Sequence, residues 1–190
     1  MKGKVISYFK ESVRVKNEFF TRNIEEIIQA VEVLRRCLVE EKRCVFVFGN
    51  GGSAADSQHF AAELVGRFRK HRRPLPVYAL TTNTSTLTAV GNDYSFKEIF
   101  RRQLEAFLKP RDVVIAISTS GLSPNVISGV ELARKMGACV ISLTGKDGGK
   151  LKEISDICLV VSSPHTSIIQ EVHIMCLHVF SYLIEESLSS

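Results

Sequence analysis

Five short apolar runs constrain the fold of this chain more than any other feature of its sequence. They lie at residues 45–48, 77–80, 113–117, 139–143 and 157–161. Each is rich in β-branched or aromatic side chains and lacks a clean alternation of polar and apolar positions, as is typical of strands covered on both faces. Helical patterns separate most of these runs, and one more follows the last; they span residues 53–67, 96–108, 124–135 and 167–186.

This order of elements predicts an α/β fold. Strands that alternate with helices form a parallel sheet with helices on both faces, which is a three-layer αβα sandwich. Connections between parallel strands are right-handed, and of the few topologies that remain we expect a five-stranded sheet with the flavodoxin-like strand order. Ligands of such sheets bind at the carboxyl ends of the strands, near the point where the strand order reverses.

Two helical patterns precede the alternating part of the chain. Val5, Phe9 and Val13 recur at loosely helical spacing, and residues 24–38 repeat Ile, Val and Leu more regularly. A chain of 190 residues has the length of one domain. We therefore predict a helical extension over residues 1–41 and a single structural unit over residues 42–190. The apolar stripe of the extension has to be buried on the core or on another subunit.

The sequence favours a protein that stays in the cytosol. No apolar run approaches the ~20 residues that a membrane span needs, and residues 1–10 lack the apolar core of a signal peptide. We therefore expect a cytoplasmic protein without a membrane partner.

Much of the net charge of +5 lies in one basic run. The run consists of Arg67, Arg69, Lys70, Arg72 and Arg73. Three interpretations are open: a solvated loop, a rim that attracts phosphate beside a site, or a nucleic-acid patch. The last is the least favoured because few stacking aromatic side chains are interleaved, so we expect no nucleic-acid partner.

The most distinctive loop follows the first apolar run. Residues 49–52 read Gly-Asn-Gly-Gly and let the backbone turn sharply, and Ser53 is a suitable N-cap for the helix that follows. A helix N-terminus beside glycines offers unpaired N–H groups to an anion such as phosphate. Further along the helix, His59 and Glu63 are four residues apart and therefore share one face.

This loop partly matches a dinucleotide-binding fingerprint. Gly49, Gly51 and Ala54 fit GxGxxA, but that motif needs an acidic residue about 20 positions further on, at the end of the second strand. Residues 79–82 read Ala-Leu-Thr-Thr, without a carboxylate, and the chain contains no GxxxxGK[ST] motif. NAD and ATP are therefore disfavoured as ligands.

Two more polar loops are expected at the same edge of the sheet. The loop at residues 81–93 is rich in Thr, Ser and Asn and ends with Asn92 and Asp93. The loop at residues 118–123 reads Ser-Thr-Ser-Gly-Leu-Ser and precedes Pro124, which suits the first helical turn. Its hydroxyl groups favour a phosphate site over an ordinary polar turn, because a single helix cap needs only one of them.

The last helical pattern is apolar on nearly every face, so we expect it to be buried in a core or at a subunit interface. Polar side chains within such a helix need hydrogen-bond partners. Gln170 and His178 are eight residues apart and lie near one face, about two turns from each other. His173 lies on a different side, and we predict a structural role for it.

Taken together, these motifs resemble the phosphoheptose isomerase family of the sugar isomerase (SIS) superfamily. The matching features are residues 48–53 with His59 and Glu63, the loop at 118–123, the segment at 143–149, and residues 170–173 with His178. The resemblance runs from Val45 to the last helix, with a similar helical extension before it. The hydroxyl-rich loop is common to the superfamily, whereas the combination of His59, Glu63, Gln170 and His178 is specific.

The resemblance implies an aldose–ketose isomerase that converts sedoheptulose 7-phosphate to D-glycero-D-manno-heptose 7-phosphate, a precursor of ADP-heptose and lipopolysaccharide. Glu63 and His178 would be its acid/base pair, and such a pair suits a reaction that moves a proton between two carbons through an enediol. The resemblance also implies a homotetramer and one zinc ion per subunit.

The site residues implied by the resemblance form three groups. The zinc ligands would be His59, Glu63, Gln170 and His178. The phosphate would be held by Ser118, Thr119, Ser120 and Ser123. The rest of the substrate would contact Asn50, Gly51, Gly52, Glu63, Arg67, Asn92, Asp93 and Gln170.

Two other functions are compatible with the hydroxyl-rich loop alone. A non-catalytic SIS protein that binds a replication initiator resembles this chain in that loop, but such proteins lack the acid/base pair. A phosphosugar-sensing regulator would carry a DNA-binding segment, and residues 1–41 show no basic recognition helix. The presence of both Glu63 and His178 therefore favours the enzyme.

Overall fold

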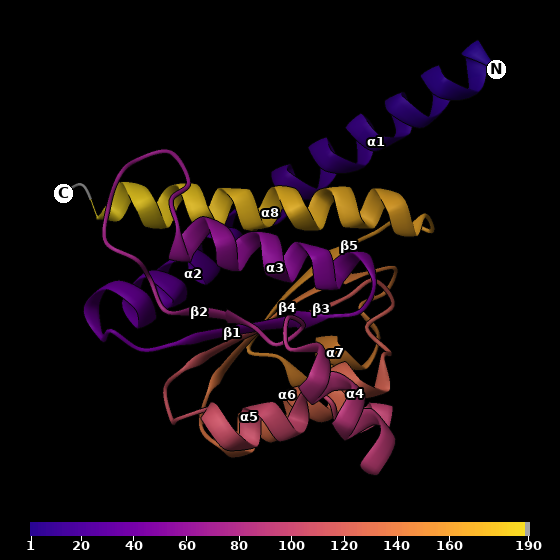
Figure 1. Ribbon diagram of the computed structural model, residues 1–190. Coiled ribbons are helices and arrows are strands. Elements are labelled where there is room, and N and C mark those ends of the chain that lie inside the picture. Colours follow the sequence, from indigo (N-terminus) through magenta and orange to yellow (C-terminus); the bar gives the residue numbers. More distant parts are fainter. Residues whose placement is uncertain (189–190) are drawn as a thin grey trace.

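The computed structural model describes residues 1–188 and contains one parallel sheet between two layers of helices (Figure 1). The strands are β1 (Val45–Gly49), β2 (Val77–Ala79), β3 (Val113–Ser118), β4 (Cys139–Gly145) and β5 (Ile157–Val161). They are ordered β2-β1-β3-β4-β5 and all pairs are parallel. This is the flavodoxin-like order, so the predicted fold class and topology are confirmed.

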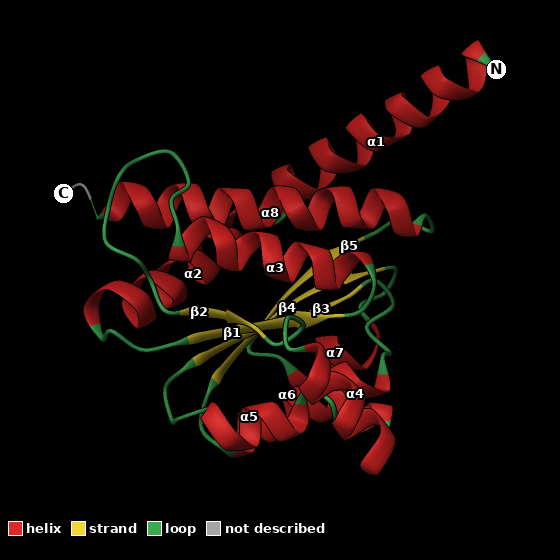
Figure 2. Ribbon diagram, viewed as in Figure 1, coloured by secondary structure: helices red, strands yellow, loops and turns green. Residues whose placement is uncertain are grey.

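The helices fall into two groups on opposite faces of the sheet (Figure 2). One face carries α2 (Ile24–Arg35), α3 (Gly52–Val65) and α8 (Thr166–Ser187), with α1 (Lys2–Arg22) beyond them. The other face carries α4 (Thr84–Asp93), α5 (Arg101–Phe107), α6 (Pro124–Lys135) and α7 (Gly149–Ile154). Short π-helical and 3-10 turns lie at Arg36–Glu40 and Phe96–Glu98.

Alternate residues of the central strands supply the two halves of the core. Val45 and Val47 pack with the α2, α3 and α8 side, and Phe46 and Phe48 pack with the opposite side. Every residue of β1 and β3 is buried. A strand that is covered on both faces gains nothing from polar positions, which explains why the sequence shows apolar runs without alternation.

The two N-terminal helices differ in how they are buried. Ala30 and Leu34 of α2 are fully buried in the same core as the sheet. By contrast, α1 points away from the body of the molecule, and Val5 and Phe9 are each 65% exposed. The predicted division between residues 41 and 42 stays a prediction, and the packing adds that α2 shares the core of the larger unit.

Two local predictions were wrong, and one short helix was not predicted. Most of the expected loop at residues 81–93 is helix α4, whose N-terminus is capped by Asn83 Oδ1, 3.0 Å from the backbone nitrogen of Thr86. Thr and Ser have low intrinsic helix propensity, so the cap and the contacts with the following turn override the composition. The expected helix at 96–108 is split into a 3-10 turn and α5, and the short helix α7 was not predicted.

Helix α8 buries one face in the core, whereas the sequence predicts burial of nearly every face, in a core or at a subunit interface. Ile169, Val172, Phe180 and Ile184 are fully buried in the core. Within the described residues, α8 is also the one helix long and apolar enough to cross a membrane, so the expectation that no segment comes close to that length was wrong. Half of this apolar stretch is buried in the fold, and Met175 is 41% exposed, so core packing accounts for one face of the helix.

Candidate active site

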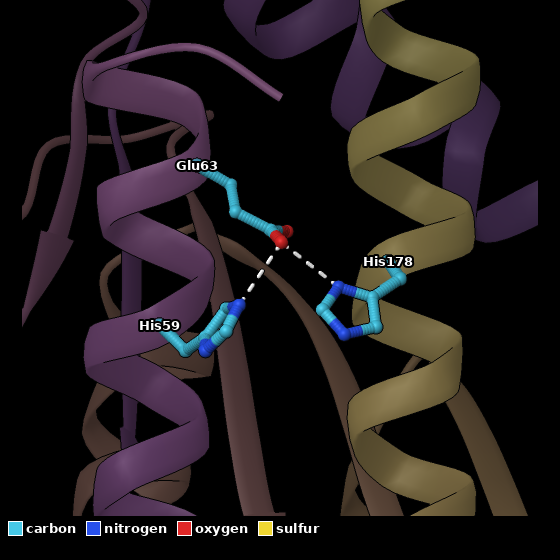
Figure 3. A group of neighbouring side chains, drawn as sticks. All are labelled: His59, Glu63 and His178. Atoms are coloured by element: carbon cyan, nitrogen blue, oxygen red, sulfur yellow. Dashed lines mark hydrogen bonds and ion pairs between the residues drawn. The ribbon is translucent and has the colours of Figure 1, made fainter. Parts of the chain in front are cut away.

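A histidine–carboxylate–histidine cluster lies between α3 and α8 (Figure 3). The two helices pack side by side, with Glu63 on α3 opposite His178 on α8. His178 Nδ1 is 2.8 Å from Glu63 Oε1, and His59 Nε2 is 3.1 Å from the same oxygen. The two imidazole rings meet edge to face at 5.1 Å. Residues 115 positions apart in sequence thus share one carboxylate oxygen.

The cluster is open on the histidine side and closed around the carboxylate. The side chains of His59 and His178 are 54% and 38% exposed, whereas that of Glu63 is 11% exposed. The second carboxylate oxygen, Oε2, is buried without a hydrogen-bond partner among the described residues. A buried, under-satisfied carboxylate has unused capacity to accept a proton or to bind a cation.

The three side chains fit a metal ion. His59, Glu63 and His178 each offer one ligand atom, and these atoms lie within 4.8 Å of one another. Imidazole nitrogen and carboxylate oxygen are donors that zinc and related ions accept. The unpartnered Oε2 of Glu63 supports this fit, because a cation would satisfy it.

Gln170, the fourth predicted ligand, lies against the first residue of α3. A Cβ atom built on Gly52 would overlap the Gln170 amide, so glycine at this position allows α8 to approach the N-terminus of α3. Gln170 thus contacts a residue that is predicted to bind the sugar. Its role as a metal ligand stays a prediction.

Two loops at the carboxyl edge of the sheet are joined by a reciprocal pair of amides. Asn50 Nδ2 donates to Asn125 Oδ1 over 2.9 Å, and Asn125 Nδ2 donates to Asn50 Oδ1 over 2.8 Å. Asn50 follows β1, and Asn125 belongs to the first turn of α6. The glycine turn and the hydroxyl-rich loop therefore have fixed positions relative to each other.

The hydroxyl-rich loop lies between β3 and the N-terminus of α6. Ser118 Oγ is 2.9 Å from Ser123 Oγ and 3.5 Å from Ser120 Oγ. Gly121 has a φ of +65°, and a Cβ there would overlap the backbone carbonyl of Gly148, so only glycine fits this turn. Three hydroxyls gathered at the start of a 12-residue helix form a suitable cradle for a phosphate.

Three other predicted substrate residues lie outside the hydrogen-bonded cluster. Asn92 and Asp93 end α4, where Asn92 Nδ2 donates to Asp93 Oδ1 over 2.8 Å, and both are exposed. Arg67 is exposed just after α3. Within residues 1–188, no hydrogen bond joins any of the three to His59, Glu63 or His178. Their part in substrate binding stays a prediction.

His173 has the structural role that its position predicts. It is fully buried, and its Nε2 donates to the backbone carbonyl of Thr144 over 3.0 Å. Burial lowers the pKa of His173 to about 4, so the ring is neutral at physiological pH. This histidine fastens α8 to β4.

Comparisons with known proteins identify the family. The family model for the SIS domain matches residues 7–145. The phosphoheptose isomerase of Aquifex aeolicus is 50% identical over 186 residues, which cover 98% of this chain and 97% of that protein. The chain belongs to the phosphoheptose isomerase family.

Solved structures of the phosphoheptose isomerase family agree with this result. The enzyme from Neisseria gonorrhoeae has a TM-score of 0.92 and 42% identity, covering 97% of this chain and 98% of that chain. The enzyme from Francisella tularensis has a TM-score of 0.93 and 38% identity, covering 97% of both chains. The family predicted from the motifs is therefore confirmed.

Sequence reasoning missed two residues that lie at this candidate site. Asp56 precedes His59 by one helical turn, and its Oδ2 is buried without a hydrogen-bond partner among the described residues. Burial raises the pKa of Asp56 to about 6, against the opposing effect of His59 and His178. The spacing of Asp56, His59 and Glu63 along one helix face was the available signal. The pairing of Asn125 with Asn50 had no comparable signal.

Proposed function

We propose that this protein is a phosphoheptose isomerase that interconverts sedoheptulose 7-phosphate and D-glycero-D-manno-heptose 7-phosphate, supplying ADP-heptose and lipopolysaccharide precursors. The observation that carries the proposal is the 2.8 Å hydrogen bond between Glu63 and His178 in a chain that is 50% identical to a phosphoheptose isomerase. The relatives in this family are phosphoheptose isomerases, and membership of the family indicates that this protein is a phosphosugar isomerase.

The acid/base pair performs two proton movements in this reaction. Conversion of the ketose to the aldose removes a proton from C1, forms an enediol and returns a proton to C2, while the hydroxyl proton moves between the two oxygens. Glu63 and His178 are close enough to exchange a proton with each other, and each can accept or donate one. We assign these steps to the two residues together.

The proposed metal is zinc, held by His59, Glu63, Gln170 and His178. When bound, zinc would polarise the carbonyl oxygen and stabilise the negative charge of the enediolate. His59 also limits where the Glu63 carboxylate can lie, since its Nε2 is 3.1 Å from Oε1. The fit of the three described donors to a cation supports the metal, and the side-chain amide of Gln170 would supply the fourth ligand.

The substrate is proposed to bind with its phosphate at the N-terminus of α6. Ser118, Thr119, Ser120 and Ser123 would hold the phosphate there, and α6 would add the favourable end of its dipole. The reacting end of the sugar would lie toward Asn50, Gly51, Gly52 and Gln170. Arg67, Asn92 and Asp93 are proposed to contact the substrate once the complex is complete.

The proposed assembly is a homotetramer in the cytoplasm. Support for an oligomer comes from α1, which is tied to α8 by Lys16 Nζ, 2.5 Å from Glu171 Oε2, yet leaves apolar side chains in solvent. Val5 and Phe9 are each 65% exposed, and a contiguous apolar face of this kind is typical of an interface. Sedimentation velocity measures the assembly directly.

The decisive experiment is incubation of the purified protein with sedoheptulose 7-phosphate, with the aldose product followed by NMR. We expect the aldose to form, and we expect ketose phosphates with shorter chains to react more slowly. Absence of any aldose would contradict the isomerase, and capture of a replication initiator in its place would favour the non-catalytic alternative.

A further inference from the structure

We propose that Glu185 is a positioning residue that holds the basic loop (residues 66–73) against His178. Glu185 lies near the end of α8 and is only 1% exposed. Its Oε1 accepts a hydrogen bond from the backbone N–H of Phe68 at 3.0 Å. Its Oε2 accepts from the backbone N–H groups of Arg69 at 2.7 Å and Lys70 at 2.8 Å. Three consecutive N–H groups thus enclose one buried carboxylate.

The basic loop is also tied to the end of α3 that carries Glu63. Arg72 Nε is 3.4 Å from Glu185 Oε1, and the Arg72 side chain is 7% exposed. The same guanidinium donates to the backbone carbonyls of Glu63 and Leu64, each over 2.7 Å. Glu185 therefore neutralises the buried cation that caps the C-terminus of α3.

Phe68 links this anchor to the reacting groups. Its ring stacks on the imidazole of His178, with centroids 6.0 Å apart and planes at 29°. The same imidazole also meets the His59 ring edge to face, with centroids 5.1 Å apart. Arg69 covers both Phe68 at 5.3 Å and Tyr182 at 4.8 Å, which holds the Phe68 ring in place. The His178 ring thus contacts two other rings while its Nδ1 lies 2.8 Å from Glu63 Oε1.

The charge of Glu185 fits this role. Burial alone would raise its pKa, but the three backbone N–H groups and Arg72 hold the pKa below its ordinary value. The group is therefore an anion throughout the physiological range and binds the loop continuously. Since Glu185 touches neither His178 nor Glu63 in any hydrogen bond of the described residues, it acts on them through Phe68 and Arg72.

The test measures kcat and KM for Glu185→Gln, Phe68→Leu and the double variant, each verified by circular dichroism as folded at the assay temperature. Glutamine keeps the shape of the side chain but offers one acceptor oxygen in place of two, and leucine keeps apolar bulk without the ring. We expect each single variant to lower kcat by about tenfold, because small displacements of reacting groups are costly. KM should stay within about twofold in Phe68→Leu, since the proposed phosphate cradle lies elsewhere, whereas in Glu185→Gln it should also rise, because the loosened loop carries Arg67.

Two readouts separate positioning from a purely structural anchor. Trypsin should cut the basic loop faster in Glu185→Gln but at the wild-type rate in Phe68→Leu, because only the first variant loosens the loop. The double variant should lose no more activity than Glu185→Gln, because both changes remove the same contact with His178. The control is Glu186→Gln, whose exposed ion pair with Lys70 contributes little, and it should behave as wild type.

Wild-type kcat in Phe68→Leu, or losses that multiply to about a hundredfold in the double variant, would overturn the inference. If Glu185→Gln does not fold, Phe68→Leu decides the question alone. The inference rests on the proposed isomerase reaction: an inactive wild type would contradict that reaction and the inference with it, whereas an active wild type with unaffected variants contradicts the inference only.

Discussion

The hydroxyl-rich loop and the α3–α8 cluster lie in one molecule but are built in opposite ways. The loop is made from six consecutive residues, and its hydroxyls bond to one another, with Ser118 Oγ 2.9 Å from Ser123 Oγ. The cluster joins residues 115 positions apart and leaves one buried carboxylate oxygen of Glu63 without a partner. Neutral hydroxyls that are already satisfied suit binding, whereas an under-satisfied ionisable group suits chemistry.

The largest expected effect is a loss of kcat when Glu63 or His178 of the α3–α8 cluster is replaced. Replacing Glu63 or His178 by glutamine removes an acid/base group while keeping its approximate size, so we expect kcat to fall on the order of 10²–10⁴-fold. The fold should survive, since both side chains lie at the contact of two helices and fill no core cluster. Product formation from sedoheptulose 7-phosphate measures kcat, and circular dichroism measures the fold.

The matched control for these variants is Glu153→Gln, because the Glu153 side chain is 67% exposed and its ion pair among the described residues is with the neighbouring Lys150. It should retain wild-type turnover. Near-normal kcat in either Glu63→Gln or His178→Gln would show that the replaced side chain is not needed for the chemistry. The assignment of chemistry to the cluster and of binding to the loop would then fail.

The second expected effect is loss of metal. We expect about one zinc per subunit by elemental analysis, and we expect His59→Ala to bind it more weakly because one of three described donors is gone. Chelation of the wild type should lower kcat by about 10²-fold, since a Lewis acid contributes several kcal/mol to such a reaction. Addition of zinc should restore the wild-type activity. Full activity in demonstrably zinc-free protein would show that the cluster works as an acid/base pair alone.

The third expected effect concerns the binding half of the comparison. Ser123→Ala removes one hydroxyl from the proposed phosphate cradle, and a hydrogen bond to a charged group contributes about 1.5–3 kcal/mol. We therefore expect KM to rise by about tenfold or more while kcat changes little. Ser162→Ala, an exposed serine after β5, serves as the control. A fall in kcat with unchanged KM would place Ser123 in the chemistry.

The contrast between the two regions also explains how far the sequence could predict the structure. The loop was predictable because its residues, its cap and Pro124 are contiguous. The shared face of His59 and Glu63 was predictable from helical periodicity within α3. Their meeting with His178 depends on how α3 and α8 pack, and periodicity carries no information about that. The resemblance to a family placed the three residues at one site but left open whether they come from one subunit or two, and the structure joins them within one chain.

The composition of residues 84–93 led to a wrong prediction, because a helix cap and tertiary packing outweighed it. Residues 84–93 contain helix-disfavouring Thr, Ser and Asn, yet they form α4, because Asn83 satisfies the N–H of Thr86 and Leu87 and Val90 pack against the apolar cluster beneath. Asp56 was missed for a different reason. A carboxylate on a helix is usually solvated, and only the structure shows that its Oδ2 is buried.

The smallest expected effect concerns Asp56, and it is a change in the free energy of unfolding, not in kcat. The folded-state pKa of Asp56 is raised from 3.8 to about 6, mainly by burial. The native state therefore keeps this proton to a higher pH than the unfolded state, so wild-type stability falls as the pH rises from about 4 to about 6 and stays lower above that. Asp56→Asn abolishes this dependence and should stabilise metal-free protein at pH 7.5 by about 1–2 kcal/mol, after allowance for solvent screening.

Denaturant unfolding of both proteins at pH 4.5 and pH 7.5 measures the difference, with the exposed Glu105→Gln as control. The advantage of Asp56→Asn should shrink at pH 4.5, because the wild-type carboxyl is then largely protonated in the native state and no longer carries the cost of a buried charge. An equal advantage at both pH values would instead indicate a packing effect of the amide. In that case Glu63 would be the one carboxylate in and beside the cluster whose burial carries an energetic cost, and the contrast with the satisfied hydroxyls of the loop would depend on that residue.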